Sequence, residues 1–83
     1  MKINFKLYAS LSEHLPPGAH ENTVQIEIPV NSSLNSIIDK YHVPREMAHL
    51  VLVNGVFACS ADRDKTILKD GDTLAIWPPV AGG

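Results

Sequence analysis

Residues 68–83 read LKDGDTLAIWPPVAGG, and this stretch decides the fold. The DGD at residues 70–72 predicts a tight turn, because glycine adopts positive φ without strain and aspartate side chains bond to nearby backbone. In the TLAIW that follows, Leu74 and Ile76 occupy alternate positions, as in a strand that buries one face. Two prolines come next and cannot continue a hydrogen-bonded ladder, so we expect the strand to end at Trp77.

The residues after this strand are predicted to form an extended tail. Paired prolines favour an extended conformation, and residues 78–83 span at most about 20 Å. Glycine has no side chain, so a Gly-Gly end fits a channel that excludes larger residues. We expect a domain at residues 1–77 and a projecting tail at 78–83; the alternative is an end without a role. The predicted tail residues are Pro78, Pro79, Val80, Ala81, Gly82 and Gly83.

The carboxyl group of Gly83 is the candidate reactive group. A terminal carboxyl has a pKa of about 3.5 and is ionised at neutral pH. Its oxygen is then an available nucleophile for the α-phosphate of ATP, and the attack would give an acyl-adenylate. A sulfur donor would displace AMP and leave a thiocarboxylate.

Upstream, four further segments are expected to be strands. Residues 2–8 and 23–29 alternate between apolar and polar side chains, as half-buried strands do. Residues 50–53, LVLV, form a continuous apolar run typical of a central strand. The Asn-Gly pair at 54–55 predicts a tight hairpin, with a short returning strand in residues 56–59.

The remaining periodic segment predicts one helix. Apolar residues recur at helical spacing from Leu34 to Tyr41, and Ser33 precedes them as a candidate N-cap. Ser10 and Glu13 have the spacing of a capping box and predict a short helical turn. Another brief turn is expected at Pro44. The order of elements argues for an α+β fold, a mixed sheet of about five strands with one main helix on one face.

The composition bounds the class of protein. The chain has 83 residues, enough for one domain with a modest core, and 45% of them are hydrophobic. The formal net charge is −2 without a basic run, which argues against a nucleic-acid partner. No stretch approaches the roughly 20 apolar residues of a membrane span, and there is no signal-peptide pattern. Cys59 is the only cysteine, so we expect no internal disulfide, no membrane partner and a cytoplasmic location.

Other residue types that carry chemistry form no recognisable site. The four histidines are not at zinc-ligand spacing with each other or with Cys59, which we expect to pack as a small apolar side chain. There is no phosphate-binding loop. Four aspartates lack the spacing of a calcium loop and are expected to form turns: Asp62, Asp64, Asp70 and Asp72. We therefore expect no metal site and no bound cofactor.

Taken together, these stretches resemble the MoaD/ThiS family of small sulfur-carrier proteins. The resemblance covers essentially the whole chain. PPVAGG is most similar to the MoaD branch, the small subunit of molybdopterin synthase. The stretches that carry it are FKLYASLSEHL (5–15), the helix capped by Ser33, LVLVNG (50–55), LKDGDTLAIWPP (68–79) and PPVAGG (78–83).

This resemblance implies a fold, a chemistry and partners. The fold would be a ubiquitin-like β-grasp. Gly83 would be adenylated by a ubiquitin-activating-type enzyme that uses ATP and Mg²⁺, and a sulfurtransferase or cysteine desulfurase would supply the sulfur. The loaded tail would insert into the large subunit of molybdopterin synthase, where sulfur passes to a pyranopterin precursor. The catalytic groups would belong to that partner, so this chain would be a non-catalytic carrier subunit.

Strand parity also predicts a partner-binding face. If Leu7 and Ile76 face the helix, Tyr8 and Trp77 lie on the opposite face, and Phe57 is expected beside them from its place after the hairpin. Exposed large aromatic residues on an open sheet face suggest an interface, while the alternative is that they cover the edge of the core. The resemblance favours the interface, because MoaD-like proteins place apolar residues at these positions against their partners.

Three alternatives stay open. In the first, the chain is a sulfur carrier for another pathway, such as the synthesis of thiazole, cysteine, thiolated tRNA or a tungsten cofactor. Gly83 would instead form isopeptide bonds with lysines, as in a ubiquitin-like protein modifier. Or the chain would be a plain interaction module with an inert tail. Residues 60–65, SADRDK, make the segment before the DGD turn longer than in many MoaD-like chains and are a candidate determinant of partner choice.

Overall fold

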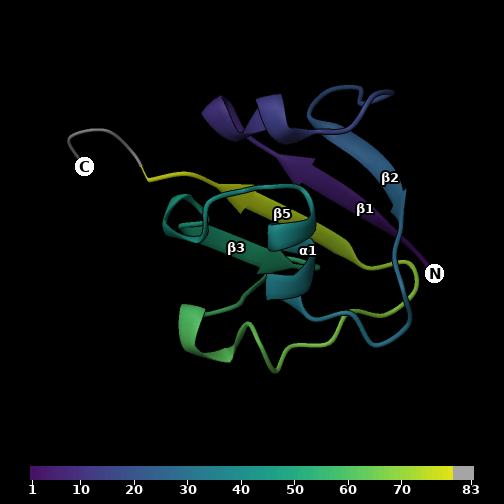
Figure 1. Ribbon diagram of the computed structural model, residues 1–83, viewed down its shortest axis with the longest axis vertical. Helices are drawn as coiled ribbons and strands as arrows, with labels where there is room; N and C mark the ends of the chain where they lie inside the picture. Colours follow the sequence, from purple (N-terminus) through teal and green to yellow (C-terminus); the bar gives the residue numbers. More distant parts are fainter. Residues whose placement is uncertain (80–83) are drawn as a thin grey trace.

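Five strands form one mixed sheet within residues 1–79, the part of the chain that the computed structural model describes (Figure 1). Their order is β2-β1-β5-β3-β4, so the last strand in the sequence lies in the middle of the sheet. β1 and β5 run parallel, and the other neighbouring pairs are antiparallel. The strands are β1 Lys2–Leu7, β2 Thr23–Glu27, β3 Leu50–Val53, β4 Val56–Phe57 and β5 Thr73–Trp77.

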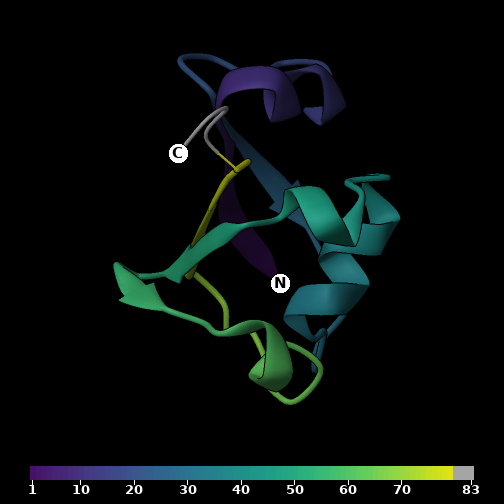
Figure 2. The same ribbon diagram turned by 90° about the vertical axis from the view of Figure 1, so that its left-hand side faces the viewer.

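A single α-helix in this described region, α1 (Leu34–Lys40), covers one face of the sheet (Figure 2). The expected α+β class, a mixed sheet of five strands with one main helix on one face, is confirmed. The brief turns expected near residues 10 and 44 are also present. The short 3-10 helices are η1 Ala9–His14, η2 Arg45–Met47 and η3 Ser60–Asp62.

Alternate side chains of β1 and β5 build the core together with one side of α1. The burial of each such side chain contributes about 1.5–3 kcal/mol to folding. The alternation predicted for β1 and the stripe predicted for α1 are confirmed. In β5, Leu74 and Ile76 are buried as predicted, but Ala75 between them is buried as well. The side chains that are at most 1% exposed include Ile3, Phe5, Leu7, Leu74, Ile76, Leu34, Ile37 and Ile38.

Ser33 caps α1, as its position in the sequence predicts. Its Oγ accepts a hydrogen bond from the backbone N–H of Ser36 at 3.2 Å, which satisfies one of the free donors of the first helical turn. The helix ends just before Tyr41, whose ring packs against Phe5 with centroids 5.0 Å apart. His42 then adopts a φ of 61°, which turns the chain away from the helical path.

The capping box predicted from Ser10 and Glu13 is wrong. η1 begins one residue earlier, at Ala9, and no side chain caps it. Ala9 has a φ of 51°, so the chain turns sharply as it leaves β1 and the helical turn starts before Ser10 can act as its cap. The hydroxyl of Ser12 instead donates to the carbonyl of Ala9 at 2.8 Å. The turn itself forms where predicted and buries Leu11 against the core.

Polar side chains lock the DGD turn to the Asn-Gly hairpin at the start of β5, a region we call the turn end. Asp72 accepts hydrogen bonds from the Asn54 side-chain amide at 2.9 Å and from the N–H of Lys69 at 2.8 Å. The N–H of Thr73 donates back to Asn54 Oδ1 at 2.8 Å. Gly71 has a φ of 86°, which favours glycine at this position. Both predicted turns are thus confirmed, and each supplies partners to the other.

β3 lies inside the sheet, between β5 and β4, but its apolar run is not buried throughout. Val51 is inaccessible to solvent, whereas Leu50 is 37% exposed. The reason is that α1 covers only one face, so alternate residues of β3 point to the other, which we call the open face. β4 is short, as expected, and ends at Phe57.

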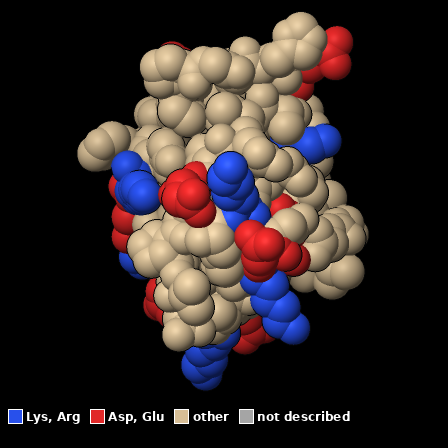
Figure 3. All heavy atoms as spheres, turned by 90° about the vertical axis from the view of Figure 1, so that its right-hand side faces the viewer, with Lys and Arg blue, Asp and Glu red and all other residues tan. Residues whose placement is uncertain are grey.

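Charged side chains of both signs are interleaved over the surface shown in Figure 3. This arrangement produces no large field of one sign on that side and accords with the formal net charge of −2. Among residues 1–79, no helix has the length and apolar character needed to span a membrane.

Candidate functional site

The strand register gathers apolar side chains on one half of the open face. Trp77 is paired with Leu50, and Leu52 is paired with both Ala75 and Phe57, so these side chains share one side of the sheet. We call this set the aromatic face. Its members are Tyr8, Leu50, Leu52, Phe57, Ala75 and Trp77.

Tyr8 and Trp77, predicted to share a face, are in direct contact. Their ring centroids are 4.4 Å apart and their planes differ by 3°, which is a stacked pair. Such a pair contributes about 0.5–1.5 kcal/mol beyond the area it buries. The stack therefore holds both side chains in fixed orientations at the end of β5.

The aromatic face leaves large apolar side chains in contact with solvent. Phe57 is 58% exposed and Leu50 is 37% exposed. Tyr8 and Trp77 are half-buried. Contiguous exposed apolar residues of this kind mark interaction surfaces in soluble domains. The structure thus brings together all three residues predicted for partner binding, and adds Leu50 and Leu52 from β3.

β5 ends beside this face at the tail root, which we define as residues Trp77–Pro79. The N–H of Tyr8 donates to the carbonyl of Ile76 at 3.1 Å, and the N–H of His49 donates to the carbonyl of Trp77 at 3.1 Å. Pro78 is half-buried and Pro79 is exposed. The remaining predicted tail residues lie outside the described residues and their roles stay predictions: Val80, Ala81, Gly82 and Gly83.

Three other side chains of types that often act in catalysis or metal binding, Cys59, Asp70 and Asp72, have structural partners. Cys59 is half-buried, and its Sγ lies 3.1 Å from Asp62 Oδ2 as a weak donor. Asp70 accepts from the N–H of Lys2 at 2.8 Å, so Asp70 and Asp72 are turn formers, as expected. Within residues 1–79 there is no group of three or more His, Cys, Asp or Glu side chains that could hold a metal ion.

Arg63 is a residue that the sequence did not single out. It is only 5% exposed, and its guanidinium donates hydrogen bonds to the carbonyls of Ala48, His49 and Ala58. Desolvation of the buried guanidinium lowers the pKa of Arg63 from its usual value. A lone arginine in the polar segment 60–65 carries no sequence signal for burial, because the same pattern is typical of solvated loops.

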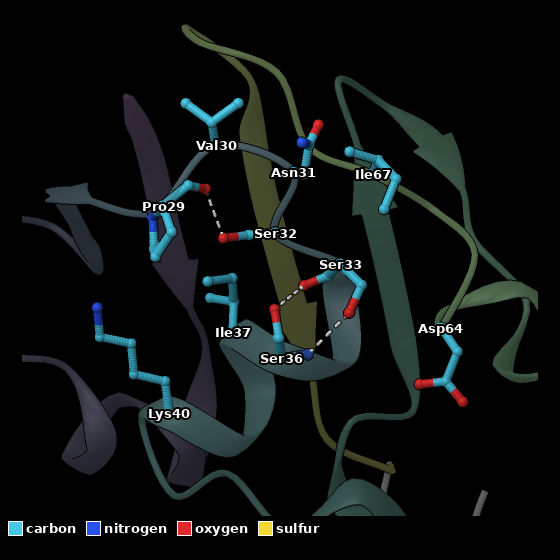
Figure 4. A pocket seen from close by; sticks show the side chains of 10 residues that line it. All are labelled: Pro29, Val30, Asn31, Ser32, Ser33, Ser36, Ile37, Lys40, Asp64 and Ile67. Carbon is cyan, nitrogen blue, oxygen red and sulfur yellow. Dashed lines mark hydrogen bonds between the residues drawn. The ribbon is translucent and has the colours of Figure 1, made fainter.

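A hollow of about 470 Å³ lies next to the start of α1 (Figure 4). Its serine hydroxyls are already engaged: Ser32 donates to the carbonyl of Pro29 at 2.6 Å, and Ser36 donates to the carbonyl of Ser33 at 2.7 Å. Its lining residues come from 29–40, 64 and 67, so the aromatic face and the tail root are not part of it.

A family comparison identifies the family to which this chain belongs. The model described as "ThiS family" matches residues 6–83, almost the entire chain. The chain belongs to the ThiS family. A Drosophila sechellia protein named Molybdopterin synthase sulfur carrier subunit is 30% identical to this ThiS-family chain over 60 residues, which are 72% of the chain and 67% of that protein.

Solved structures share the fold of this chain. Small archaeal modifier protein 1 of H. volcanii superimposes with a TM-score of 0.66 at 26% identity, covering 95% of this chain and 98% of that one. A complex of subunits 1 and 2 of Molybdopterin-converting factor from Helicobacter pylori contains a chain that matches with a TM-score of 0.58 at 21% identity, with full coverage of both chains. The ubiquitin-like β-grasp fold and the resemblance to MoaD/ThiS proteins are confirmed.

Proposed function

We propose that this ThiS-family chain is a sulfur carrier that is loaded at Gly83 and serves as the small subunit of molybdopterin synthase. The observation that carries the proposal is the position of the tail root. β5 delivers Pro78 and Pro79 directly beside the exposed aromatic face, so a partner that binds this face is adjacent to the start of the tail. The homology to a molybdopterin synthase sulfur carrier subunit supports the choice of pathway.

The proposed chemistry takes place at the carboxyl group of Gly83. An oxygen of the carboxylate attacks the α-phosphorus of ATP, held with Mg²⁺ by the adenylating enzyme, and pyrophosphate leaves. The terminal sulfur of a persulfide, carried by a sulfurtransferase or cysteine desulfurase, attacks the acyl carbon and displaces AMP. A thiol then cleaves the acyl disulfide, which releases the thiocarboxylate and leaves a disulfide between the two former thiol sulfurs.

The partners approach through the aromatic face. Tyr8, Phe57 and Trp77 supply aromatic anchors of the type that dominates binding energy in protein interfaces. The Helicobacter pylori protein of the same fold is solved as a complex of two subunits of Molybdopterin-converting factor, which supports a second, larger subunit as one proposed partner. The ubiquitin-activating-type enzyme is the other proposed partner.

Intact-mass measurement tests the proposal. The chain is incubated with ATP, Mg²⁺, the adenylating enzyme and a persulfide-generating desulfurase. The expected product has one oxygen replaced by sulfur in the peptide that contains Gly83. A matched control carries a short extension after Gly83, which blocks the carboxyl group and is expected to abolish the mass change. An unchanged mass of the unextended chain in the presence of an active loading system would contradict a carrier function.

A second candidate function is protein modification. The likeness to small archaeal modifier protein 1, at 26% identity over nearly the whole chain, favours it. Both functions use the same activated carboxyl group and differ in the acceptor, which is a sulfur donor in one and a lysine amine in the other. Isopeptide adducts that carry this chain on lysines of other proteins, without a thiocarboxylate intermediate, would favour the modifier.

A further inference from the structure

Arg63 is a buried charge that has no charged partner among the residues the structure describes. Its side chain is 5% exposed. Within residues 1–79, the ion pairs found do not include it. A buried guanidinium carries a desolvation cost that is offset only when its donors are well bonded. The identity of its acceptors therefore shows what the residue does.

The three acceptors lie at the open end of the β3–β4 hairpin. Nη1 donates to the carbonyl of Ala48 at 2.6 Å, and Nη2 donates to that of His49 at 3.3 Å, both just before β3. Nε donates to the carbonyl of Ala58, just after β4, at 3.3 Å. Arg63 thus joins the two chain segments that enter and leave the hairpin.

The shortest of these bonds leads to the tail root through one peptide group. The carbonyl of Ala48 and the N–H of His49 belong to the same peptide unit. That N–H donates to the carbonyl of Trp77 at 3.1 Å. The carbonyl of Trp77, in turn, belongs to the peptide unit that contains the nitrogen of Pro78, so the orientation of this peptide plane sets the direction in which the tail leaves.

A charged donor at one end of such a chain strengthens the bond at the other end. Hydrogen bonds from an ionised group are about twice as strong as neutral ones, and bonded groups polarise one another in a low dielectric. The guanidinium pulls electron density toward the Ala48 carbonyl and makes the His49 N–H a better donor.

We infer that Arg63 is a positioning residue for the tail root: through the Ala48–His49 peptide unit it holds the carbonyl of Trp77, and so the exit of Pro78. This inference rests on the proposed function for its consequence, namely that the tail is aimed before a partner receives it. It also gives residues 60–65 a role within the chain, since they present Arg63 to the hairpin.

We call the chain of hydrogen bonds from Arg63 through the Ala48–His49 peptide unit to the Trp77 carbonyl the relay. Amide hydrogen exchange tests the relay and does not depend on sulfur chemistry. In Arg63→Met, the N–H of His49 is expected to exchange about tenfold faster or more, because the charge-assisted bond to the Ala48 carbonyl of the same peptide unit is lost, together with the bonds to His49 and Ala58. The N–H of Phe5 in the core is expected to keep its rate. Arg45→Met is the matched control, because the Arg45 side chain is exposed and, within residues 1–79, donates its hydrogen bonds to Asp39 alone. It should leave the exchange of His49 unchanged.

Unchanged exchange at His49 in Arg63→Met would overturn the inference, and so would an equal acceleration at Phe5, which would make Arg63 a general stabiliser only. If Arg63→Met does not fold, Arg63→Lys and the wild type decide. The scalar coupling across the hydrogen bond from the His49 N–H to the Trp77 carbonyl is expected in the wild type and should weaken in Arg63→Lys. An undetectable coupling in the wild type would likewise overturn the relay.

Loading kinetics separate this inference from the proposed function. The kcat/KM for adenylation of Gly83 is expected to fall severalfold in Arg63→Met and to stay unchanged in Arg45→Met. If the wild type is not adenylated at all, the proposed function fails while the exchange result still decides the relay. If the wild type is adenylated and Arg63→Met is loaded at the same rate despite faster exchange at His49, the positioning role is refuted.

Discussion

The two ends of β5 are built by different forces. At the turn end, Asp72 and Asn54 exchange side-chain and backbone hydrogen bonds that join two turns. At the tail root, Trp77 is held by the ring of Tyr8 and by a backbone bond from His49. Polar groups satisfy one another at the first end, whereas the second leaves apolar area exposed.

This difference separates residues that stabilise the fold from residues that are available for the proposed partner. The DGD turn is internally bonded, so it contributes directional contacts that fix where β5 begins. The aromatic face, with Phe57 more than half exposed, is apolar surface of the kind that protein interfaces bury. Changes at the turn end should therefore affect the free energy of unfolding, and changes at the tail root should affect the affinity for a partner.

The largest expected effect is on binding, from Trp77→Ala. Removal of the indole should weaken the affinity for the adenylating enzyme or the large synthase subunit by about 2 kcal/mol or more, the range of an interface hot spot. Calorimetric titration measures it, with Trp77→Tyr as a control that keeps an aromatic ring. Equal affinities for the wild type and Trp77→Ala would mean that the aromatic face is not the docking surface.

The opposite end is expected to respond in the free energy of unfolding. Asp72→Ala removes acceptors for the Lys69 N–H and the Asn54 amide, and should cost about 1–2 kcal/mol. Chemical denaturation measures the loss, and the folded variant should bind its partners as the wild type does. Asp70→Ala, which removes one acceptor for the Lys2 N–H, should cost less. A binding defect in folded Asp72→Ala would contradict the expectation that the turn end affects stability alone.

A smaller effect is expected for Tyr8, which supports Trp77. Tyr8→Ala should lose the stacking contribution of about 0.5–1.5 kcal/mol, divided between stability and affinity. Tyr8→Phe keeps the stacked ring and should behave as the wild type in both measurements. If Tyr8→Phe is as weak as Tyr8→Ala, the hydroxyl rather than the stack carries the effect.

The smallest effect is expected from the ion pair between Asp39 and Arg45, which belongs to neither end of β5. The hydrogen bond from Arg45 lowers the pKa of Asp39 in the folded state. The pair therefore stabilises the fold at any pH above the unfolded-state pKa of this carboxyl. This contribution is lost as the pH falls through the lowered folded-state pKa. Asp39→Asn should be slightly less stable than the wild type at neutral pH, and the gap should close in acid. Thermal unfolding across pH measures this, and a gap that widens in acid would contradict the pairing.

Much of the fold was predictable because its signals are local. Alternation placed Phe5 and Ile76 in the core, and Ser33 was recognisable as a cap from its position alone. The same parity placed Tyr8 and Trp77 on one face. Each of these inferences needs only the period of the element and the residue that precedes it.

What could not be predicted depends on contacts between distant segments. The run LVLV does not say that α1 covers one face only, so the exposure of Leu50 required the whole sheet. Arg63 looks solvated in its own segment and is buried because the hairpin offers carbonyls that need donors. Ser10 failed as a cap because the conformation of Ala9 is set by the exit from β1, which no capping pattern encodes.

The central place of β5 also has a mechanical consequence. The strand is bonded to β1 on one side and to β3 on the other, along most of its length. A pull on the tail directed along the strand loads the rungs of both ladders together, in shear, instead of peeling them apart one by one. A protein that draws the tail into its interior, and later lets it go, can therefore exert force on this chain without unravelling the domain to which the tail is joined.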